Sequence, residues 1–200
     1  MSTDRRALIV TGAVELIATR GIRALTHRAL DAHLGLPPGS TSYYFRTRQA
    51  LIEAVADGIT SRSRADFAEM FAPDSLESLS GAEAVRRELA SAIATWLDQL
   101  LARRRDELIA RHALIIEVLS DPELHARLAG GLFSHDRATG LFTALGAPDP
   151  DAAAADFLAL LEGLVFDRFA GARAGEPAGT ADSVALLTRP LAKFLAVNGA

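Results

Sequence analysis

Helical spacing of apolar residues is the feature that most constrains how this chain of 200 residues can fold. Between residues 4 and 20, Ile9, Ala13, Leu16 and Ile17 recur every three or four positions, the period of one face of an α-helix. No segment shows the sustained alternation typical of a half-buried strand, and no Asn-Gly or Asp-Gly hairpin turn lies between β-branched runs. The sequence therefore predicts an all-α protein.

Capping residues and helix breakers divide the chain into separate helices. Gly21 and Gly35 are typical of helix ends, and Thr26, Thr47 and Asp121 are typical helix caps. The predicted helices cover residues 4–20, 26–34, 37–44, 47 onward, 82–101, 106–119, 122–145, 149–170 and 180–197, the seventh with a break at Gly130-Gly131. The segment from Met70 to Gly81 is the expected join between a small amino-terminal head and a larger body.

Composition and charge narrow the function classes. The chain has no cysteine, which excludes a disulfide scaffold, a zinc ribbon and a thiol nucleophile. Its net charge of −4 hides an asymmetry, because the first 50 residues hold seven arginines against three acidic residues, while the remaining 150 carry a net −8. A positive head on a negative body indicates a polyanionic partner for the head, although a chance excess of arginine would give the same count.

Two short helices joined by a tight turn are predicted within the positive head. Residues 25–34 and 39–45 are separated by Gly35-Leu36-Pro37-Pro38, which is the pattern of a helix-turn-helix. The second helix begins with the small residues Gly39-Ser40-Thr41-Ser42, which allow its backbone to approach base edges in the major groove. The hydroxyls of these residues can donate to or accept from any base.

The sequence around this motif is similar to a known family. The run Leu25-Thr26-His27-Arg28-Ala29-Leu30, a Gly-Leu turn, the run Gly39-Ser40-Thr41-Ser42-Tyr43-Tyr44-Phe45-Arg46-Thr47-Arg48 and then Leu51-Ile52 resemble the DNA-binding head of the TetR family of bacterial transcriptional regulators. The resemblance covers residues 5 to 55, whereas the remainder of the chain matches only in length and helix pattern. It implies a three-helix DNA-binding head over residues 1–50 and a helical ligand-binding and dimerisation body over residues 51–200.

Eleven residues of the head are predicted to contact DNA: Thr26, His27, Arg28, Pro38, Gly39, Ser40, Thr41, Ser42, Tyr43, Tyr44 and Arg48. Arg28 is the candidate for a bidentate contact to guanine, and Arg48 for a phosphate at the start of its helix. The two tyrosines offer phenolic donors to phosphates, with Tyr43 the better placed. Phe45 is expected in the core, against Leu8, Leu16 and Leu51.

Each of these assignments has an alternative. Thr26 and Thr47 would cap their helices whether or not they also bind phosphate. Arg28 and Arg48 would look the same in the sequence if they were solvated surface charges. One of the two tyrosines could pack inside the head.

The last two predicted helices carry apolar stripes: Phe157, Leu160, Leu161, Leu164, Phe166 and Phe169 on one, and Val184, Leu187, Leu191, Phe194 and Leu195 on the other. One head reads only a few base pairs, and the resemblance implies a four-helix interface at these helices. We therefore expect a homodimer through the last two helices on palindromic double-stranded DNA. The alternative is that both stripes pack within one protomer.

The resemblance also implies a pocket for an unknown small-molecule effector between the middle helices. Aromatic and apolar walls with a few polar groups suit such a pocket. By residue type, the candidates are Trp96, His112, Ile116, Glu117, Phe133, Phe142 and Leu161. The same residues at helical spacing are also typical of an ordinary core.

Enzymatic signatures are missing from the sequence. It contains no metal-ligand spacing of histidines and acids, no glycine-rich phosphate loop and no Gly-x-Ser-x-Gly elbow, so we expect no catalysis, no metal and no cofactor.

Charges within the most apolar segment, residues 152–174, argue against a membrane span, and a cytoplasmic location is expected. The predicted function is a dimeric transcriptional repressor released from its operator by an effector. The alternative is an all-helical interaction or scaffold protein without DNA binding.

Overall fold

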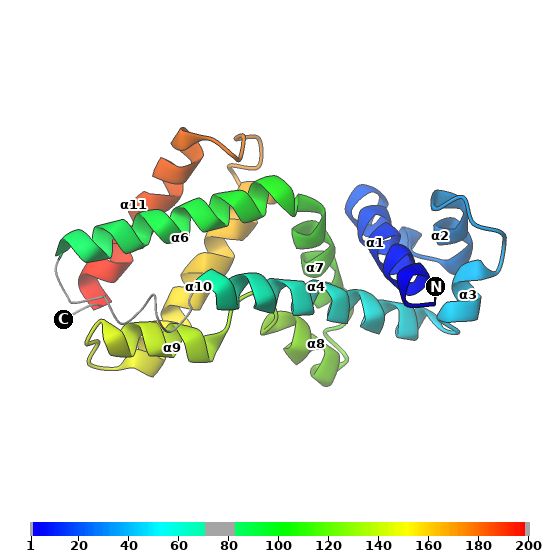
Figure 1. Cartoon of the computed structure of the whole chain (residues 1–200), viewed down its shortest axis with the longest axis horizontal. Helices are drawn as coiled ribbons and strands as arrows, with labels where there is room; N and C mark the ends of the chain where they lie inside the picture. The colour runs from blue at the N-terminus through cyan, green and yellow to red at the C-terminus, as the bar shows by residue number, and fades with distance from the viewer. Residues whose placement is uncertain (1, 71–82, 199–200) are drawn as a thin grey trace. The chain divides into compact units, whose positions relative to one another are not determined.

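The computed structural model describes residues 2–70 and 83–198, and all regular secondary structure in these ranges is helical (Figure 1), which confirms the all-α class. The elements are α1 (Ser2–Arg20), the 3-10 turn η1 (Ile22–Ala24), α2 (His27–His33), α3 (Ser40–Tyr44), α4 (Arg48–Met70), α6 (Glu83–Arg103), α7 (Arg105–Glu117), α8 (Pro122–Ala129), α9 (His135–Ala144), α10 (Pro150–Phe169) and α11 (Ala181–Asn198). The predicted join after Met70 lies outside the described residues.

The predicted caps begin the helices as expected. The side-chain oxygens of Thr26, Thr47 and Asp121 accept hydrogen bonds from backbone N–H groups three residues later, at 3.1, 3.0 and 3.1 Å. Asp149, just before α10, does the same at 3.1 Å. Each satisfies a donor that the first turn of a helix leaves unpaired. The predicted break at residues 130–131 is also confirmed, because α8 ends at Ala129 and α9 begins at His135.

The third helix begins later than predicted. The sequence suggested a start at Pro37, but α3 begins at Ser40, after Gly39 with a φ of 90°. That φ lies in the left-handed region that favours glycine and cannot continue a right-handed helix. Pro37 and Pro38 therefore belong to the turn before α3.

The described residues form two compact units. The first is made from Met1–Arg64 and Asp106–Leu132, and the second from Ala65–Arg105 and Phe133–Ala200. The first unit thus extends past residue 50 along α4 and includes nearly all of α7 and the whole of α8. The division of roles between residues 1–50 and 51–200 stays a prediction.

The first unit has one core. Its α1 stripe, formed by Ile9, Ala13, Leu16 and Ile17, is at most 1% exposed. The core also takes in buried residues from η1 to α4, α7 and α8: Leu25, Leu30, Phe45, Leu51, Val55, Ala110, Leu114, Leu124 and Leu128. Leu8 was expected against Phe45, but it is 43% exposed, because it lies one position before Ile9 on the outer side of α1.

In the second unit, α6 packs along α11, and α9 packs along α10. Phe142, Phe157 and Phe194 form an aromatic cluster with ring centroids 5.4 to 5.9 Å apart. Phe157, Leu161, Leu187, Leu191 and Leu195 are buried within this unit, so these members of the two predicted stripes are core residues of the protomer.

A buried polar network ties α6 to the segment before α11. Asp98, which is 3% exposed, accepts hydrogen bonds from the Gly179 N–H at 2.9 Å and from the Ser183 hydroxyl. Arg168, which is 5% exposed, donates to the Ser183 hydroxyl oxygen at 2.7 Å and to the carbonyl of Pro177 at 3.1 Å. The Ser183 hydroxyl thus bridges the buried guanidinium and the buried carboxylate, since it accepts from Arg168 and donates to Asp98.

Candidate nucleic-acid interface

The orientation of α3 is set by a buried carboxylate in α2. Asp31, which is 4% exposed, accepts from the Gly39 N–H, the Thr41 N–H and the Thr41 hydroxyl at 2.8, 2.8 and 2.6 Å. The first two donors belong to the cap and first turn of α3, where the backbone leaves N–H groups unpaired. Asp31 therefore acts as a cap supplied from a neighbouring helix. Sequence reasoning treated Asp31 only as a charge.

The ionised form of Asp31 is the one that these contacts favour. Burial raises the pKa of the carboxyl, but the hydrogen bonds from Thr41 and Gly39, together with the nearby His27, outweigh burial and hold the pKa below its ordinary value. A carboxylate that accepts several hydrogen bonds is stabilised as the anion, so Asp31 remains charged at neutral pH.

Thr41 is placed differently from the prediction. It was expected to face bases, but it is fully buried, and its hydroxyl is donated to Asp31. The DNA contact predicted for Thr41 is therefore wrong, and its role is to position α3. A sequence signal for this existed: Thr41 precedes the core residue Phe45 by four positions, which places both on one face of a helix.

Most of the other residues predicted to contact DNA have exposed side chains. Thr26, Arg28, Pro38, Gly39 and Ser42 are exposed, and Tyr43 is 78% exposed. Ser40 and Tyr44 are half-buried, and the Tyr44 ring meets the Tyr43 ring edge-on at 5.1 Å. We call the exposed set, Arg28, Pro38, Gly39, Ser42 and Tyr43, the reading face. Among the described residues, none forms a hydrogen bond or ion pair with Arg28.

Two basic side chains brace the carboxyl end of α3. His27 Nε2 lies 2.7 Å from the Phe45 carbonyl oxygen, and since a carbonyl only accepts, this nitrogen donates. Arg6 Nη2 donates to the Tyr44 carbonyl at 3.2 Å, and its guanidinium lies 4.8 Å from the centre of the Phe45 ring. His27 was expected near bases or phosphates, but it is half-buried and bound to the Phe45 carbonyl at the end of α3. Sequence reasoning missed Arg6.

Arg48, the predicted phosphate ligand, is engaged within the first unit. Its Nη1 lies 3.0 Å from Glu117 Oε1 in α7, and its Nη2 donates to the Ile22 carbonyl at 3.3 Å. Its side chain is 42% exposed, so part of the guanidinium still faces solvent. Glu117, predicted in the effector pocket, is thus the partner of a predicted DNA contact.

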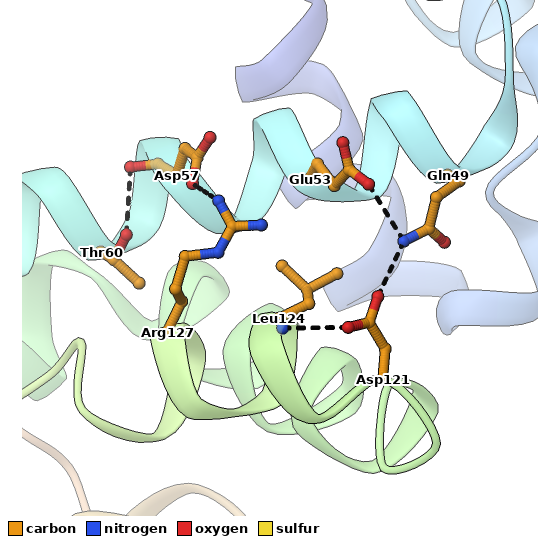
Figure 2. Close-up of polar contacts among 7 residues, drawn as sticks. All are labelled: Gln49, Glu53, Asp57, Thr60, Asp121, Leu124 and Arg127. Atoms are coloured by element: carbon orange, nitrogen blue, oxygen red, sulfur yellow. Dashed lines mark hydrogen bonds and ion pairs between the residues drawn. The ribbon is translucent and has the colours of Figure 1, made fainter.

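Helix α8 lies along α4 and is joined to it by polar contacts (Figure 2). Gln49 Nε2 donates to Asp121 at 3.2 Å, and Arg127 pairs with Asp57 at 3.0 Å. At Gly131 the approach is so close that an added Cβ would lie 2.2 Å from the Thr60 methyl carbon. These contacts fix α8 to the same helix that follows the reading face.

The predicted effector residues are divided between the two units. His112, Ile116 and Glu117 belong to the first unit, and Ile116 is 70% exposed. Trp96, Phe133, Phe142 and Leu161 belong to the second, in which Phe142 and Leu161 are fully buried and the rings of Trp96 and Phe133 meet at 5.9 Å. The structure does not bring the seven together within one unit, and the pocket stays a prediction.

Neither a membrane-spanning helix nor a metal-binding cluster of three or more His, Cys, Asp or Glu occurs among residues 2–70 and 83–198. Helices α2 and α3 instead expose the Arg28 guanidinium and the hydroxyls of Ser42 and Tyr43, of which the Ser42 hydroxyl donates to the Gly39 carbonyl at 2.9 Å. Such donors bind phosphates and base edges.

Comparison with known proteins agrees with this geometry. Residues 9–55 match the model of bacterial regulatory proteins of the tetR family, and residues 84–193 match the tetracyclin repressor-like C-terminal domain. A sequence comparison with curated proteins gives no match.

Several solved structures share the fold. A TetR-family member from Streptomyces coelicolor A3 has a TM-score of 0.67 and 23% identity, covering 92% of this chain and 96% of that one. A transcriptional regulator from Saccharomonospora viridis in complex with choline has a TM-score of 0.70 and 18% identity, covering 98% of both chains. The multidrug binding protein EbrR complexed with ethidium has a TM-score of 0.61 and 23% identity, covering 92% of this chain and 97% of that one.

The carboxyl-terminal model alone covers more than half of the chain, and the amino-terminal model covers the helix-turn-helix that Asp31 organises. This chain belongs to the TetR family of bacterial transcriptional regulators and is a DNA-binding regulator, not an enzyme.

Proposed function

We propose that this regulator is a dimeric repressor that binds a palindromic operator and is released from it by a small-molecule effector. The observation that carries the proposal is the reading face, which is exposed at the surface while the carboxylate that orients α3 is buried beneath it. A rigid, preorganised helix loses little entropy when it enters the major groove. The cytoplasmic location expected from the sequence belongs to the same proposal.

The dimer is supported by the exposed side of α10. Five of its exposed residues recur at helical spacing and are small or aromatic: Ala152, Ala155, Ala159, Gly163 and Phe166. Asp151 and Asp156 are also exposed on this helix. Small residues allow two helix backbones to approach closely, and Phe166, 47% exposed, adds apolar area. We name this set the α10 face and propose that it meets its copy in a two-fold dimer.

Gly163→Arg is expected to convert the dimer into monomers. An added Cβ at Gly163 has no neighbour within 4 Å in the protomer, so the protomer tolerates the change, while an arginine in the dimer would separate the two α10 faces. Gly140→Arg in α9 is the matched control, since its Cβ also has no neighbour within 4 Å. Sedimentation velocity should give a monomer only for Gly163→Arg. A dimeric Gly163→Arg protein would exclude the α10 face as the interface.

The effector part of the proposal is supported by the complexes of two proteins of the same fold. EbrR is complexed with ethidium and the Saccharomonospora viridis regulator with choline. In this chain the half-buried Trp96 and the buried Phe133 meet edge-on in the second unit, and we propose them as aromatic walls of the effector site. An effector that prefers the DNA-free arrangement of the heads would shift the population away from the operator.

The test begins with fragments of genomic DNA selected by the purified protein, from which a palindromic duplex is taken. Fluorescence anisotropy should then give tighter binding to this duplex than to a scrambled one. Compounds related to the neighbouring genes should weaken binding, with a coupling of about 1 to 3 kcal/mol. Equal effector affinity for free and DNA-bound protein would contradict the repressor mechanism.

Arg28 and Arg48 are expected to affect binding differently. Arg28→Ala should relax preference at one base pair of each half-site, since a bidentate contact is worth about 1 to 3 kcal/mol of discrimination. Arg48→Ala should weaken all duplexes alike and reduce the salt slope by about 1 for each head, if Arg48 exchanges part of its contact with Glu117 for a phosphate. Uniform weakening by both substitutions, with an unchanged salt slope, would disprove these roles.

A further inference from the structure

A groove of about 480 Å³ lies between α1 and α4, entirely within the first unit. Its volume is in the range of small-molecule sites, which is about 300 to 1,000 Å³. Its walls are apolar and small, with Ala7, Val10 and Val14 from α1 and Ala54, Gly58 and Ile59 from α4. The two helices approach each other closely at Gly58, where an added Cβ would lie 3.0 Å from a Val10 methyl carbon.

The charged residues of the groove leave one cation in excess. Arg62 Nη1 and Glu107 Oε1 pair at 2.7 Å, so their charges cancel. Arg6 also lines the groove, and its contacts among the described residues are a hydrogen bond to the Tyr44 carbonyl and the face of Phe45. A guanidinium has five N–H donors, so Arg6 retains donors for an anion.

We propose that this groove is a binding site for a small carboxylate with an apolar aromatic or aliphatic body. The body would lie against Val10, Val14 and Ile59, and the carboxylate would accept hydrogen bonds from Arg6. A planar carboxylate matches the fork of a guanidinium, whereas an ammonium group would be repelled by it. The proposed site uses none of the residues predicted for the effector pocket.

An occupant would also act on α3, a consequence that rests on the proposed DNA binding. Arg6 donates to the last residue of α3 and covers Phe45, its C-terminal cap. A bound carboxylate competes with the Tyr44 carbonyl for the Arg6 guanidinium. It also neutralises one positive charge of the DNA-binding head, which lowers the attraction for phosphates. Binding of the carboxylate should therefore weaken binding of DNA.

The binding arm of the test uses the full-length protein without DNA. Methyl-labelled protein is titrated with 1-naphthoate and, separately, with the neutral analogue 1-naphthalenemethanol, while the methyl resonances of Val10, Val14 and Ile59 are followed. Naphthoate should shift these resonances saturably and bind about three- to fivefold more tightly than the alcohol, the effect of one exposed ion pair. Arg6→Gln should remove this preference. Arg5→Gln, which removes a charge from the same helix but outside the groove, should retain it.

The outcomes separate this proposal from the proposed function. Unshifted Val10 and Ile59 resonances, or equal affinity for the two probes, would overturn the carboxylate site whatever the protein does to DNA. In the DNA arm, saturating naphthoate should weaken operator binding by the wild-type protein and Arg5→Gln more than by Arg6→Gln. Occupation of the groove with unchanged DNA affinity would disprove the action on α3, while failure of the unliganded protein to bind any duplex would refute the proposed function alone.

Discussion

Asp31→Asn is expected to weaken operator binding by about 5- to 150-fold, equivalent to losing one base contact of about 1 to 3 kcal/mol. The carboxylate uses both oxygens to accept three hydrogen bonds from Gly39 and Thr41. An asparagine of the same size has one acceptor oxygen, so its NH2 group would face one of these donors. The first turn of α3 would lose its fixed orientation, and the reading face with it. Fluorescence anisotropy with the operator duplex measures the change.

The control for lost negative charge is Asp4→Asn, since Asp4 is exposed in α1. This variant should bind DNA at least as tightly as the wild type, because it removes a repulsive charge without affecting α3. An Asp31→Asn protein with unchanged operator affinity would show that α3 does not depend on this carboxylate.

Asp31 also has a predicted signature in the pH dependence of stability. Its pKa is lower in the folded protein than its ordinary value, so it favours folding when ionised. This contribution is fully present above the unfolded-state pKa of about 3.9 and is lost as the pH falls through the lower folded-state value. The difference in free energy of unfolding between wild type and Asp31→Asn, measured by denaturation between pH 3 and 7, should therefore shrink as the pH is lowered.

Asp98→Ala is expected to reduce the free energy of unfolding by about 3 to 5 kcal/mol, the usual effect of leaving a buried charge without compensation. Removal of Asp98 takes the acceptor from Ser183 and Gly179, and it leaves Arg168 buried with no anion in its network. Urea denaturation at one fixed protein concentration measures the loss, since a dimer's stability varies with concentration.

The double variant Asp98→Ala/Arg168→Met tests whether the uncompensated charge of Arg168 causes this loss of stability. If the uncompensated cation dominates, the double variant should be clearly more stable than the sum of the two single changes predicts, because the single losses share one cause. Strictly additive effects would mean that Asp98 and Arg168 act separately.

Helices and their caps could be predicted from the sequence because their signals are local. The spacing of Ile9, Ala13 and Leu16 and the caps at Thr26 and Asp121 depend on residues a few positions apart. The late start of α3 could not be predicted, because proline is common at the first position of a helix and Pro37 fits that position. The start is instead decided by the positive φ of Gly39.

The polar contacts that organise the molecule could not be predicted in the same way. Asp31 and Thr41 are ten residues apart, and Asp98 and Ser183 are 85 apart, so their pairing depends on how helices pack. Thr41 was misplaced because its size and hydroxyl suit DNA, while its spacing from Phe45 identifies it as a core position. The guanidinium of Arg48 suits a phosphate, but the residue that it pairs with, Glu117, lies 69 positions away in α7.

The salt dependence of DNA binding tests most directly the claim that the surface around α3 binds the DNA backbone and bases. With two heads that each contact two or three phosphates, the logarithm of the binding constant should fall with the logarithm of salt concentration with a slope of about −4 to −5, at about −0.9 per contact. The operator should also bind more tightly than a scrambled duplex at every salt concentration. A slope near zero, or equal affinity for both duplexes, would contradict the account.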